Sequence, residues 1–94
     1  MLERQPRDAF LLYALGMEHK KLNDLDKAIE FYSRTIEVDP NYCYAYYQRG
    51  QVFEQKGDAD SAKQSYKDGI DAARRINDDH ARSELETALQ MMEG

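Results

Sequence analysis

The chain resembles itself when it is shifted by 34 residues, and this internal repeat constrains its fold more than any other feature. The matches are unevenly placed, since small residues meet small ones and tyrosines meet tyrosines. They are Pro6 and Pro40, Tyr13 and Tyr47, Gly16 and Gly50, Asp24 and Asp58, Asp26 and Asp60, Ala28 and Ala62, Tyr32 and Tyr66, and Ile36 and Ile70. A unit of this length cannot bury its apolar face alone, so the repeat predicts units that stack on one another.

Each unit is predicted to contain two helices and a turn. The chain has only two Pro and five Gly, and its many Ala, Leu, Glu, Lys, Gln and Arg residues favour helix over strand. Asn23 and Gly57 tolerate the left-handed backbone that ends a helix, and Pro40 disfavours helix in the residue before it. We therefore expect an all-α chain of five helices, with turns at about 22–24, 39–41, 56–58 and 76–79.

Aspartates beside the turns are predicted to cap the helices. Asp8, Asp24 and Asp58 stand where a side chain can accept the free backbone N–H groups at a helix start, and residues 77–79 are expected to cap the fifth helix. The same aspartates lack the twelve-residue loop and the terminal Glu of a calcium site. Capping is therefore the preferred interpretation, and no metal site is predicted.

Apolar residues at helical spacing predict which helix faces pack together. The first helix is expected to bury Leu12, Leu15, Gly16 and His19. Small residues at Gly16, Ala28, Gly50 and Ala62 are expected to let helices approach closely, and Tyr32 and Tyr66 to fill the gap to the following unit. In the fifth helix an apolar stripe is expected to cover the end of the second unit; it consists of Ala81, Leu85, Ala88, Leu89 and Met92.

The expected organisation is one small domain over residues 1–94. Repeat one covers about 7–40, repeat two about 41–76, and a capping helix about 79–92.

Charge and composition exclude several classes of function. The net charge of −5 and the lack of a basic cluster argue against nucleic acid as a partner. The longest apolar run, Ala9–Leu15, is far shorter than the ~20 residues that span a bilayer, and no leader peptide is visible. The single cysteine, Cys43, fits a reducing compartment, so we expect a cytoplasmic location and no cofactor.

The residues of the two units resemble the tetratricopeptide-repeat family. The first unit matches with Leu15-Gly16, Ala28, Tyr32 and Pro40, and the second with Gly50, Phe53, Ala62 and Tyr66. The resemblance implies an α-solenoid of two helical hairpins with a C-terminal capping helix. Arg74 stands where the second unit would carry its terminal proline, which predicts an extra turn on its last helix.

The resemblance also implies a site. In this family one stripe of each first helix lines a concave groove that holds a peptide of a partner protein. Here those stripes are Phe10, Tyr13, Met17 and Lys21, and then Tyr44, Tyr47, Gln51 and Gln55. Tyr46 is expected in the core and Tyr42 at the surface. The alternative interpretation is that an aromatic stripe at helical spacing is simply more core.

Some members of the family hold a terminal carboxylate with basic and amide side chains. The matching positions here are Tyr13, Met17, Gln48, Asp78 and Arg82, and only Arg82 fits. An aspartate in such a site would repel the ligand, so this activity is not expected.

Two hypotheses of function remain after the chemistry is considered. His19, His80 and Cys43 have no arrangement of partners that would support a nucleophile or a general base, so an enzyme is not expected. The leading hypothesis is a non-enzymatic module that binds a protein or peptide partner in the groove. The alternative is a structural unit that associates with copies of itself, and the solution mass over a dilution series distinguishes them.

Overall fold

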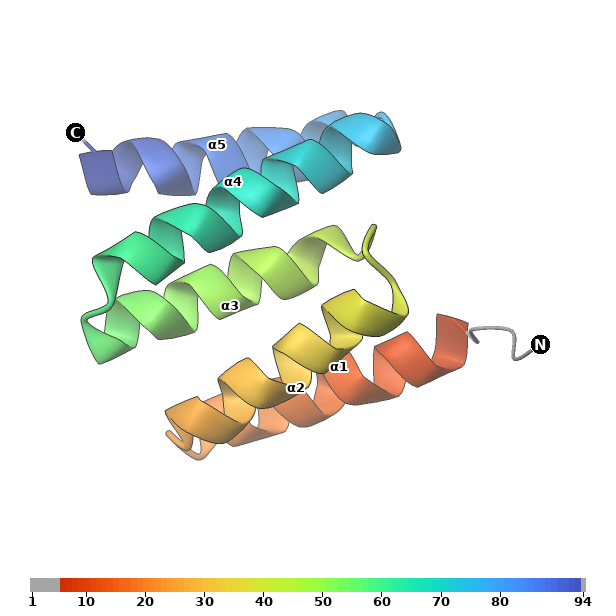
Figure 1. Ribbon diagram of the computed structural model, residues 1–94, viewed down its shortest axis with the longest axis vertical. Coiled ribbons are helices and arrows are strands. Elements are labelled where there is room, and N and C mark those ends of the chain that lie inside the picture. Colours follow the sequence, from red (N-terminus) through yellow and green to blue (C-terminus); the bar gives the residue numbers. More distant parts are fainter. Residues whose placement is uncertain (1–5, 94) are drawn as a thin grey trace.

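The structure is a computed structural model that describes residues 6–93. These residues form five helices and no strand, which confirms the predicted all-α fold (Figure 1). The helices are α1 (Pro6–Lys21), α2 (Leu25–Val38), α3 (Cys43–Lys56), α4 (Ala59–Arg75) and α5 (Asp79–Glu93). The breaks between them lie at the predicted turns.

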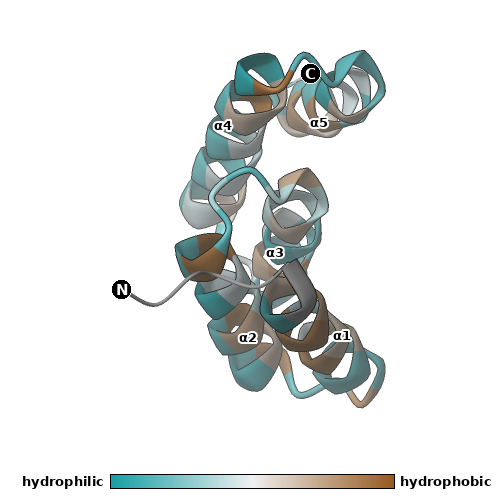
Figure 2. Ribbon diagram, turned by 90° about the vertical axis from the view of Figure 1, so that its right-hand side faces the viewer, coloured by the Kyte–Doolittle hydropathy of each residue, from teal (hydrophilic) through white to brown (hydrophobic). Residues whose placement is uncertain are grey.

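The helices pack in two layers. Each helix contacts the next one in the chain, and Figure 2 shows α2 and α4 on one side of the molecule with α1, α3 and α5 on the other. The chain therefore advances from α1 at one end to α5 at the opposite end. This arrangement leaves one side of the molecule lined by the first helix of each unit and by α5.

Left-handed residues end three of the helices, as the sequence predicts for the first two hairpins. Asn23 has a φ of 62°, Gly57 of 82° and Asn77 of 57°. Asn tolerates this conformation and Gly adopts it freely, so the chain can turn back at once after α1, α3 and α4.

The predicted caps are only partly present. Asp58 accepts a hydrogen bond from Ser61 N at 3.1 Å, and Asp78 accepts one from Ala81 N at 3.0 Å. Asp24 precedes α2 but makes no cap hydrogen bond with its side chain. The prediction for Asp8 is wrong, because α1 begins at Pro6 and Asp8 lies in its first turn. Proline suits a helix start, since it has no N–H to leave unpaired.

The small residues and tyrosines pack as a repeated unit. A Cβ atom on Gly16 would lie 2.5 Å from the Tyr32 ring, and one on Gly50 would lie 2.4 Å from the Tyr66 ring. Each tyrosine is fully buried on the glycine of its own hairpin. Gly69 of α4 likewise allows close packing on both sides, since a Cβ there would meet Tyr46 of α3 and Leu85 of α5. A methyl group at any of these positions forces a large side chain to move.

The first helix departs from the expected core pattern. Leu12 and His19 are half-buried, but Leu15 is 44% exposed, so its assignment to the core is wrong. In addition to Gly16, the buried residue of this helix is Ala9. Leu15 lies at the surface, where none of the described helices covers it.

The second unit confirms the effect of its missing proline. Helix α4 has 17 residues and α2 has 14, so α4 is longer by nearly one turn. The extra length begins with the buried Ala73, which belongs to the same core cluster as Ala81 and Leu85 of α5. Arg49, which stands in place of an apolar residue, donates hydrogen bonds to Ser33 of α2 and Ser65 of α4, at 3.2 and 3.1 Å.

Candidate binding groove

Two residues of the predicted α1 stripe, Tyr13 and Met17, pack inside the molecule, and the other two lie at its surface. Tyr13 packs on Tyr32 with ring centroids 5.7 Å apart and on Tyr42 at 4.9 Å. Met17 accepts a hydrogen bond from the Tyr32 hydroxyl, with oxygen and sulfur 3.2 Å apart. These contacts belong to the core of the first repeat. Tyr42, predicted at the surface, is half-buried by the same contact.

The remaining members of the α1 stripe lie at the surface. The Phe10 side chain is 57% exposed, and Lys21 is also exposed. The neighbouring Lys20 reaches α3, where its Nζ donates to Gln48 Oε1 at 2.6 Å and to Gln51 Oε1 at 2.9 Å. Gln51 is therefore half-buried and oriented by a residue that the sequence did not single out. Burial lowers the pKa of the Lys20 ammonium.

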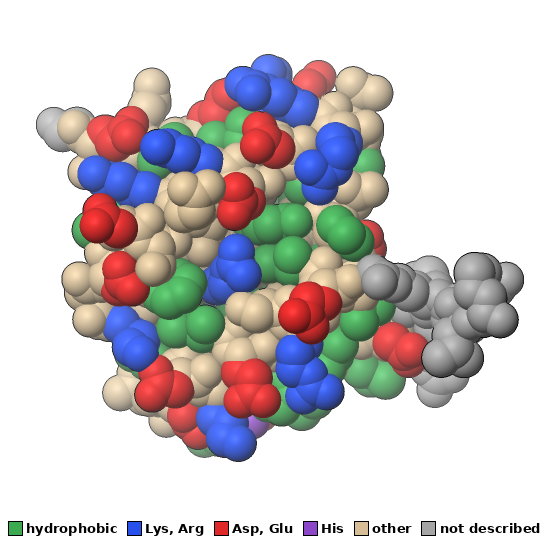
Figure 3. Space-filling model, viewed as in Figure 1, with side chains coloured by type: hydrophobic (Ala, Val, Ile, Leu, Met, Phe, Trp, Pro, Cys, Tyr) green, Lys and Arg blue, Asp and Glu red, His purple; other side chains and the backbone are tan. Residues whose placement is uncertain are grey.

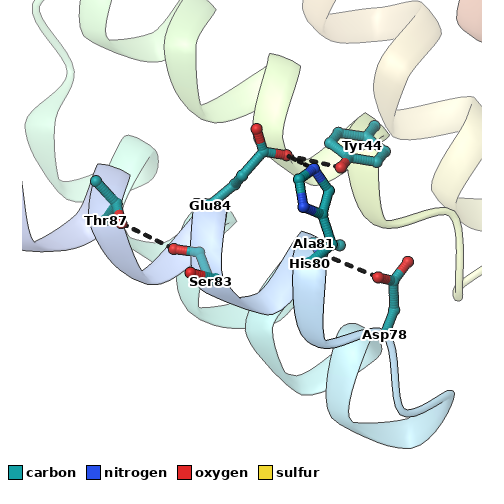
Figure 4. Close-up of polar contacts among 7 residues, drawn as sticks. All are labelled: Tyr44, Asp78, His80, Ala81, Ser83, Glu84 and Thr87. Carbon is teal, nitrogen blue, oxygen red and sulfur yellow. Dashed lines mark hydrogen bonds and ion pairs between the residues drawn. The ribbon is translucent and has the colours of Figure 1, made fainter.

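The stripe of α3 faces α5. Tyr44 and Tyr47 pack edge to face with ring centroids 6.3 Å apart, and both are half-buried. The Tyr44 hydroxyl donates to Glu84 Oε1 of α5 at 2.6 Å (Figure 4). The hydrogen bond to this carboxylate, with a smaller contribution from burial, raises the pKa of Tyr44 to about 12. The contact fixes α5 against α3.

A pocket of about 490 Å³ opens between α3, α4 and α5, and we call it the α3–α5 pocket. Its lining residues are Tyr47, Gln51 and Glu54 of α3, Tyr66 of α4, and Ser83, Glu84, Thr87, Ala88, Met91 and Met92 of α5. Of these, the predicted site contained only Tyr47 and Gln51, since Tyr66 was assigned to packing. Ala88 and Met92 belong to the apolar stripe that the sequence predicts for this helix. Glu84, Thr87 and Met91 share a face of α5 with Ala88 by helical spacing but lie outside that stripe.

A carboxylate of α3, that of Glu54, also lines the pocket and is bonded to Tyr66 of α4. The Tyr66 hydroxyl donates a short hydrogen bond to Glu54 Oε2. Burial of the ring and this carboxylate together raise the pKa of Tyr66. Figure 4 shows the corresponding arrangement at the other wall, where Glu84 reaches from α5 toward Tyr44 and His80 Nε2 lies 3.5 Å from the Glu84 carboxylate.

The residues of the carboxylate-binding pattern have other roles here. Gln48 accepts the hydrogen bond from Lys20, Asp78 caps α5, and an Arg82 nitrogen lies 3.6 Å from Asp79. These side chains are engaged separately and do not converge on one point of the groove.

The groups that could react are engaged in packing. The His19 ring stacks on Phe31 with centroids 5.3 Å apart, and burial raises the pKa of the Cys43 thiol. Within residues 6–93, no three His, Cys, Asp or Glu side chains gather as they would around a metal ion. Nor does any helix of that part of the chain combine the length and the apolar character that crossing a membrane requires.

Comparison with known proteins places the same repeats on this chain. Two models of the tetratricopeptide repeat match residues 9–42 and 31–64. A TPR repeat-containing protein of Pseudomonas aeruginosa is 27% identical over 99% of this chain and 89% of its own length. The photosystem I assembly protein Ycf3 of Acaryochloris marina is 33% identical, and the match covers 61% of this chain but only 35% of that protein.

A solved structure has the same architecture. The crystal structure of a tetratricopeptide repeat domain protein from Salinibacter ruber is 34% identical, with a TM-score of 0.83 over 92% of this chain and 96% of that one. Likeness of this extent covers both hairpins and the helix that follows them. The chain therefore belongs to the tetratricopeptide-repeat family, whose repeats generally mediate contacts between proteins.

Proposed function

We propose that this protein is a non-enzymatic interaction module that binds a peptide segment of a partner protein in the groove beside α3 and α5. The observation that carries the proposal is the α3–α5 pocket, about 490 Å³ in volume, with the Met91 side chain 80% exposed at its edge. A large apolar side chain left in water beside a concave surface is typical of an interaction site. Thioethers also adapt to ligands of different shape.

The proposal agrees with what the family does and with the name of one relative. Tetratricopeptide repeats generally act between proteins, and Ycf3 is named for assembly of photosystem I. We place the function in the cytoplasm, because the single cysteine suits a reducing compartment. The division into repeats at about 7–40 and 41–76 and a capping helix at about 79–92 is part of the same proposal.

The groove proposal is tested by mapping where peptides bind. Backbone amide NMR shifts of the whole chain are followed while pools of short synthetic peptides are added. We expect the perturbed amides to cluster on α3 and α5, around Tyr47, Gln51 and Met91. Perturbations confined to α2 and α4, around Lys27, Lys63 and Lys67, would contradict the proposal.

Two exposed positions on the same helix give a matched pair of variants. Met91→Gln is expected to weaken peptide binding about fivefold, because it removes an exposed apolar anchor without disturbing the core. Gln90→Ala is the control, since Gln90 is also exposed on α5 but lines a different hollow with Arg74. If both variants bind equally well, the pocket is not the site.

Self-association is a second candidate, and the surface of α1 favours it. Leu11 is 49% exposed and Leu15 44%, and helical spacing places both on one face of α1. Leu22, which is 68% exposed, follows directly after the helix. In α3 the counterparts of Leu11 and Leu15 are Ala45, which is fully buried, and Arg49, which donates a hydrogen bond to Ser33 of α2. No described helix covers α1 in this way.

We propose a second copy of the chain as the cover in this alternative, because an antiparallel pair of α1 helices places the same exposed leucines of both copies together. A sedimentation series over a wide dilution range tests this idea. We expect a dimer that Leu15→Glu dissociates, whereas a monomer at every concentration would exclude it.

A further inference from the structure

The α3–α5 pocket carries negative charge and no basic side chain among its lining residues. Glu54 lies on the α3 wall and Glu84 on the α5 wall. The other polar groups of the lining, such as Ser83, Thr87 and Gln51, are neutral. Any ligand that fills the pocket therefore meets two carboxylates.

Tyrosine hydroxyls hold both carboxylates in place. Tyr66 donates to Glu54, and Tyr44 donates to Glu84 at 2.6 Å. A phenol donates one hydrogen bond and leaves the carboxylate its charge and its other lone pairs. Within residues 6–93, Glu54 forms no ion pair, and the ion-pair partner of Glu84 is the exposed His80 at 3.5 Å. The two charges are thus positioned without being neutralised by Lys or Arg.

Apolar surface lies beside these charges. Tyr47, Ala88 and Met92 line the same pocket as the two glutamates, and the exposed Met91 extends the apolar surface outward. On the α1 side, the Lys20 ammonium is bonded to the amide oxygens of Gln48 and Gln51. The pocket thus combines an apolar surface with fixed negative charge.

The opposite face of the molecule has no such separation of charge. Figure 3 shows the side on which α2 and α4 lie in front, where Lys and Arg side chains alternate with Asp and Glu. Several of these charges pair with one another, as Arg74 does with Asp71 and Glu86 at about 4 Å. A surface of this kind favours neither sign of ligand, whereas the pocket favours a cation.

We propose that the α3–α5 pocket selects a partner segment in which Lys or Arg stands beside a large apolar side chain. This inference rests on the proposed function, because it assigns the chemistry of the ligand to that groove. The apolar side chain packs on Tyr47, Ala88 and Met92, which are the partly exposed apolar residues of the lining. The cation pairs with Glu54 or Glu84, whose carboxylates the two tyrosines already orient, so little side-chain freedom is lost on binding.

The test begins with a phage-displayed library of random short peptides selected on the whole chain. We expect the enriched sequences to place Lys or Arg within a few residues of Leu, Ile, Met or Phe. One enriched sequence is then synthesised in three forms that carry Lys, Gln or Glu at the basic positions. Their Kd values, from fluorescence anisotropy, should increase in that order, with Gln about fivefold weaker than Lys.

Salt and protein variants localise the effect. Raising NaCl from about 50 to about 500 mM should weaken the Lys peptide and leave the Gln peptide almost unchanged. Glu84→Gln keeps an acceptor for Tyr44 and should weaken only the Lys peptide, about fivefold. Glu86→Gln is the matched control on α5, since Glu86 faces Arg74 outside the pocket, and its Kd should match the wild type.

The outcomes separate the two proposals. Selected peptides that perturb amides of α3 and α5 but carry no cation, or that bind Lys and Gln forms equally, overturn the charge preference and leave the groove intact. If no selected peptide perturbs α3 or α5, the groove itself is wrong, and the charge preference falls with it. Because the Lys-to-Gln change is made in the peptide, the comparison does not depend on the folding of any protein variant.

Discussion

At the C-terminal end of the molecule α5 covers the last repeat with Leu85, whose side chain is 1% exposed, whereas at the N-terminal end Leu15 of α1 is 44% exposed. Helix α5 brings its apolar side to α4 and exposes Gln90 and Glu93. Helix α1 buries the small Ala9 and Gly16 and leaves Leu11 and Leu15 exposed. Helix α5 therefore closes the core of the last repeat, whereas α1 leaves apolar side chains exposed at the other end.

The difference shows how a two-unit solenoid closes. An array of repeats needs a polar outer face at its ends, and α5 provides one. In the described residues α1 exposes apolar side chains instead, and such a face is typical of a helix that packs against another element. The α3–α5 pocket lies beside α5, which forms one of its walls, whereas Phe10 of α1 is 57% exposed.

Removal of α5 is expected to have the largest effect. A chain that stops at residue 77 loses Leu85 and Ala81 from the core and exposes Tyr46, Gly69 and Ile70 to water. We expect loss of cooperative unfolding, followed by aggregation. Circular dichroism melts and light scattering measure both. A truncated chain that stays monomeric and melts like the full one would show that the two ends are equivalent.

The same substitution at both ends sharpens the comparison. Leu85→Ala should lower the free energy of unfolding by about 2–5 kcal/mol, because it leaves a cavity between α4 and α5. Leu15→Ala, made on a half-open surface, should cost about 0.5 kcal/mol. Urea unfolding, followed at a protein concentration too low for dimers, gives both values. If both substitutions lower the free energy of unfolding equally, the Leu15 side chain is buried in solution by another contact.

Adding a methyl group under each repeated tyrosine compares the two hairpins. Gly50→Ala and Gly16→Ala both force a tyrosine ring to move, at a cost of about 1–3 kcal/mol, offset by up to about 1 kcal/mol of helix propensity. Gly50→Ala should cost more, because Tyr66 is also held by Glu54, while Tyr32 is held by the softer sulfur of Met17. Urea midpoints measure the difference, and a reversed order would contradict this explanation.

The repeat in the sequence was sufficient to predict the fold and the residues that recur in each hairpin. A shift of 34 residues pairs Gly16 with Gly50 and Tyr32 with Tyr66, and the tyrosines are expected to fill the gap to the following unit. In the structure each tyrosine also packs on the glycine of its own hairpin, a contact between helices joined by a short turn that recurs in both units. The left-handed turn at Gly57 was also predicted, since few other residues adopt it.

The pocket could not be predicted from the repeat in the sequence. Spacing along a helix shows which residues share a face, but not which other helix covers that face. Tyr13 and Tyr47 occupy the same place in the repeat, yet Tyr13 packs on Tyr42 and Tyr47 lines a pocket, because only Tyr47 has α5 beside it. Helix α5 has no counterpart in the repeat, so its Glu84 and Met91 were not singled out.

The smallest expected effect concerns the titration of Tyr44, which ties α3 to α5. Its hydrogen bond to the Glu84 carboxylate raises the pKa of Tyr44 to about 12, above the ordinary value of 10.0. The pKa is higher in the folded chain than in the unfolded one. The stability that this pair contributes is therefore complete below about pH 10 and is lost as the pH rises through about 12.

Tyr13, at the other end of the groove, supplies the internal comparison. Its pKa is also raised, but chiefly by burial, and its polar neighbour is the amide of Gln48 rather than a carboxylate. Glu84→Gln should therefore move the Tyr44 titration back toward pH 10 and leave that of Tyr13 unchanged. Absorbance at the tyrosinate band, with Tyr44→Phe as the subtraction control, measures the shift. If Glu84→Gln moves both tyrosines equally, the effect comes from a loosened groove and not from the carboxylate, because only a change in packing reaches α1.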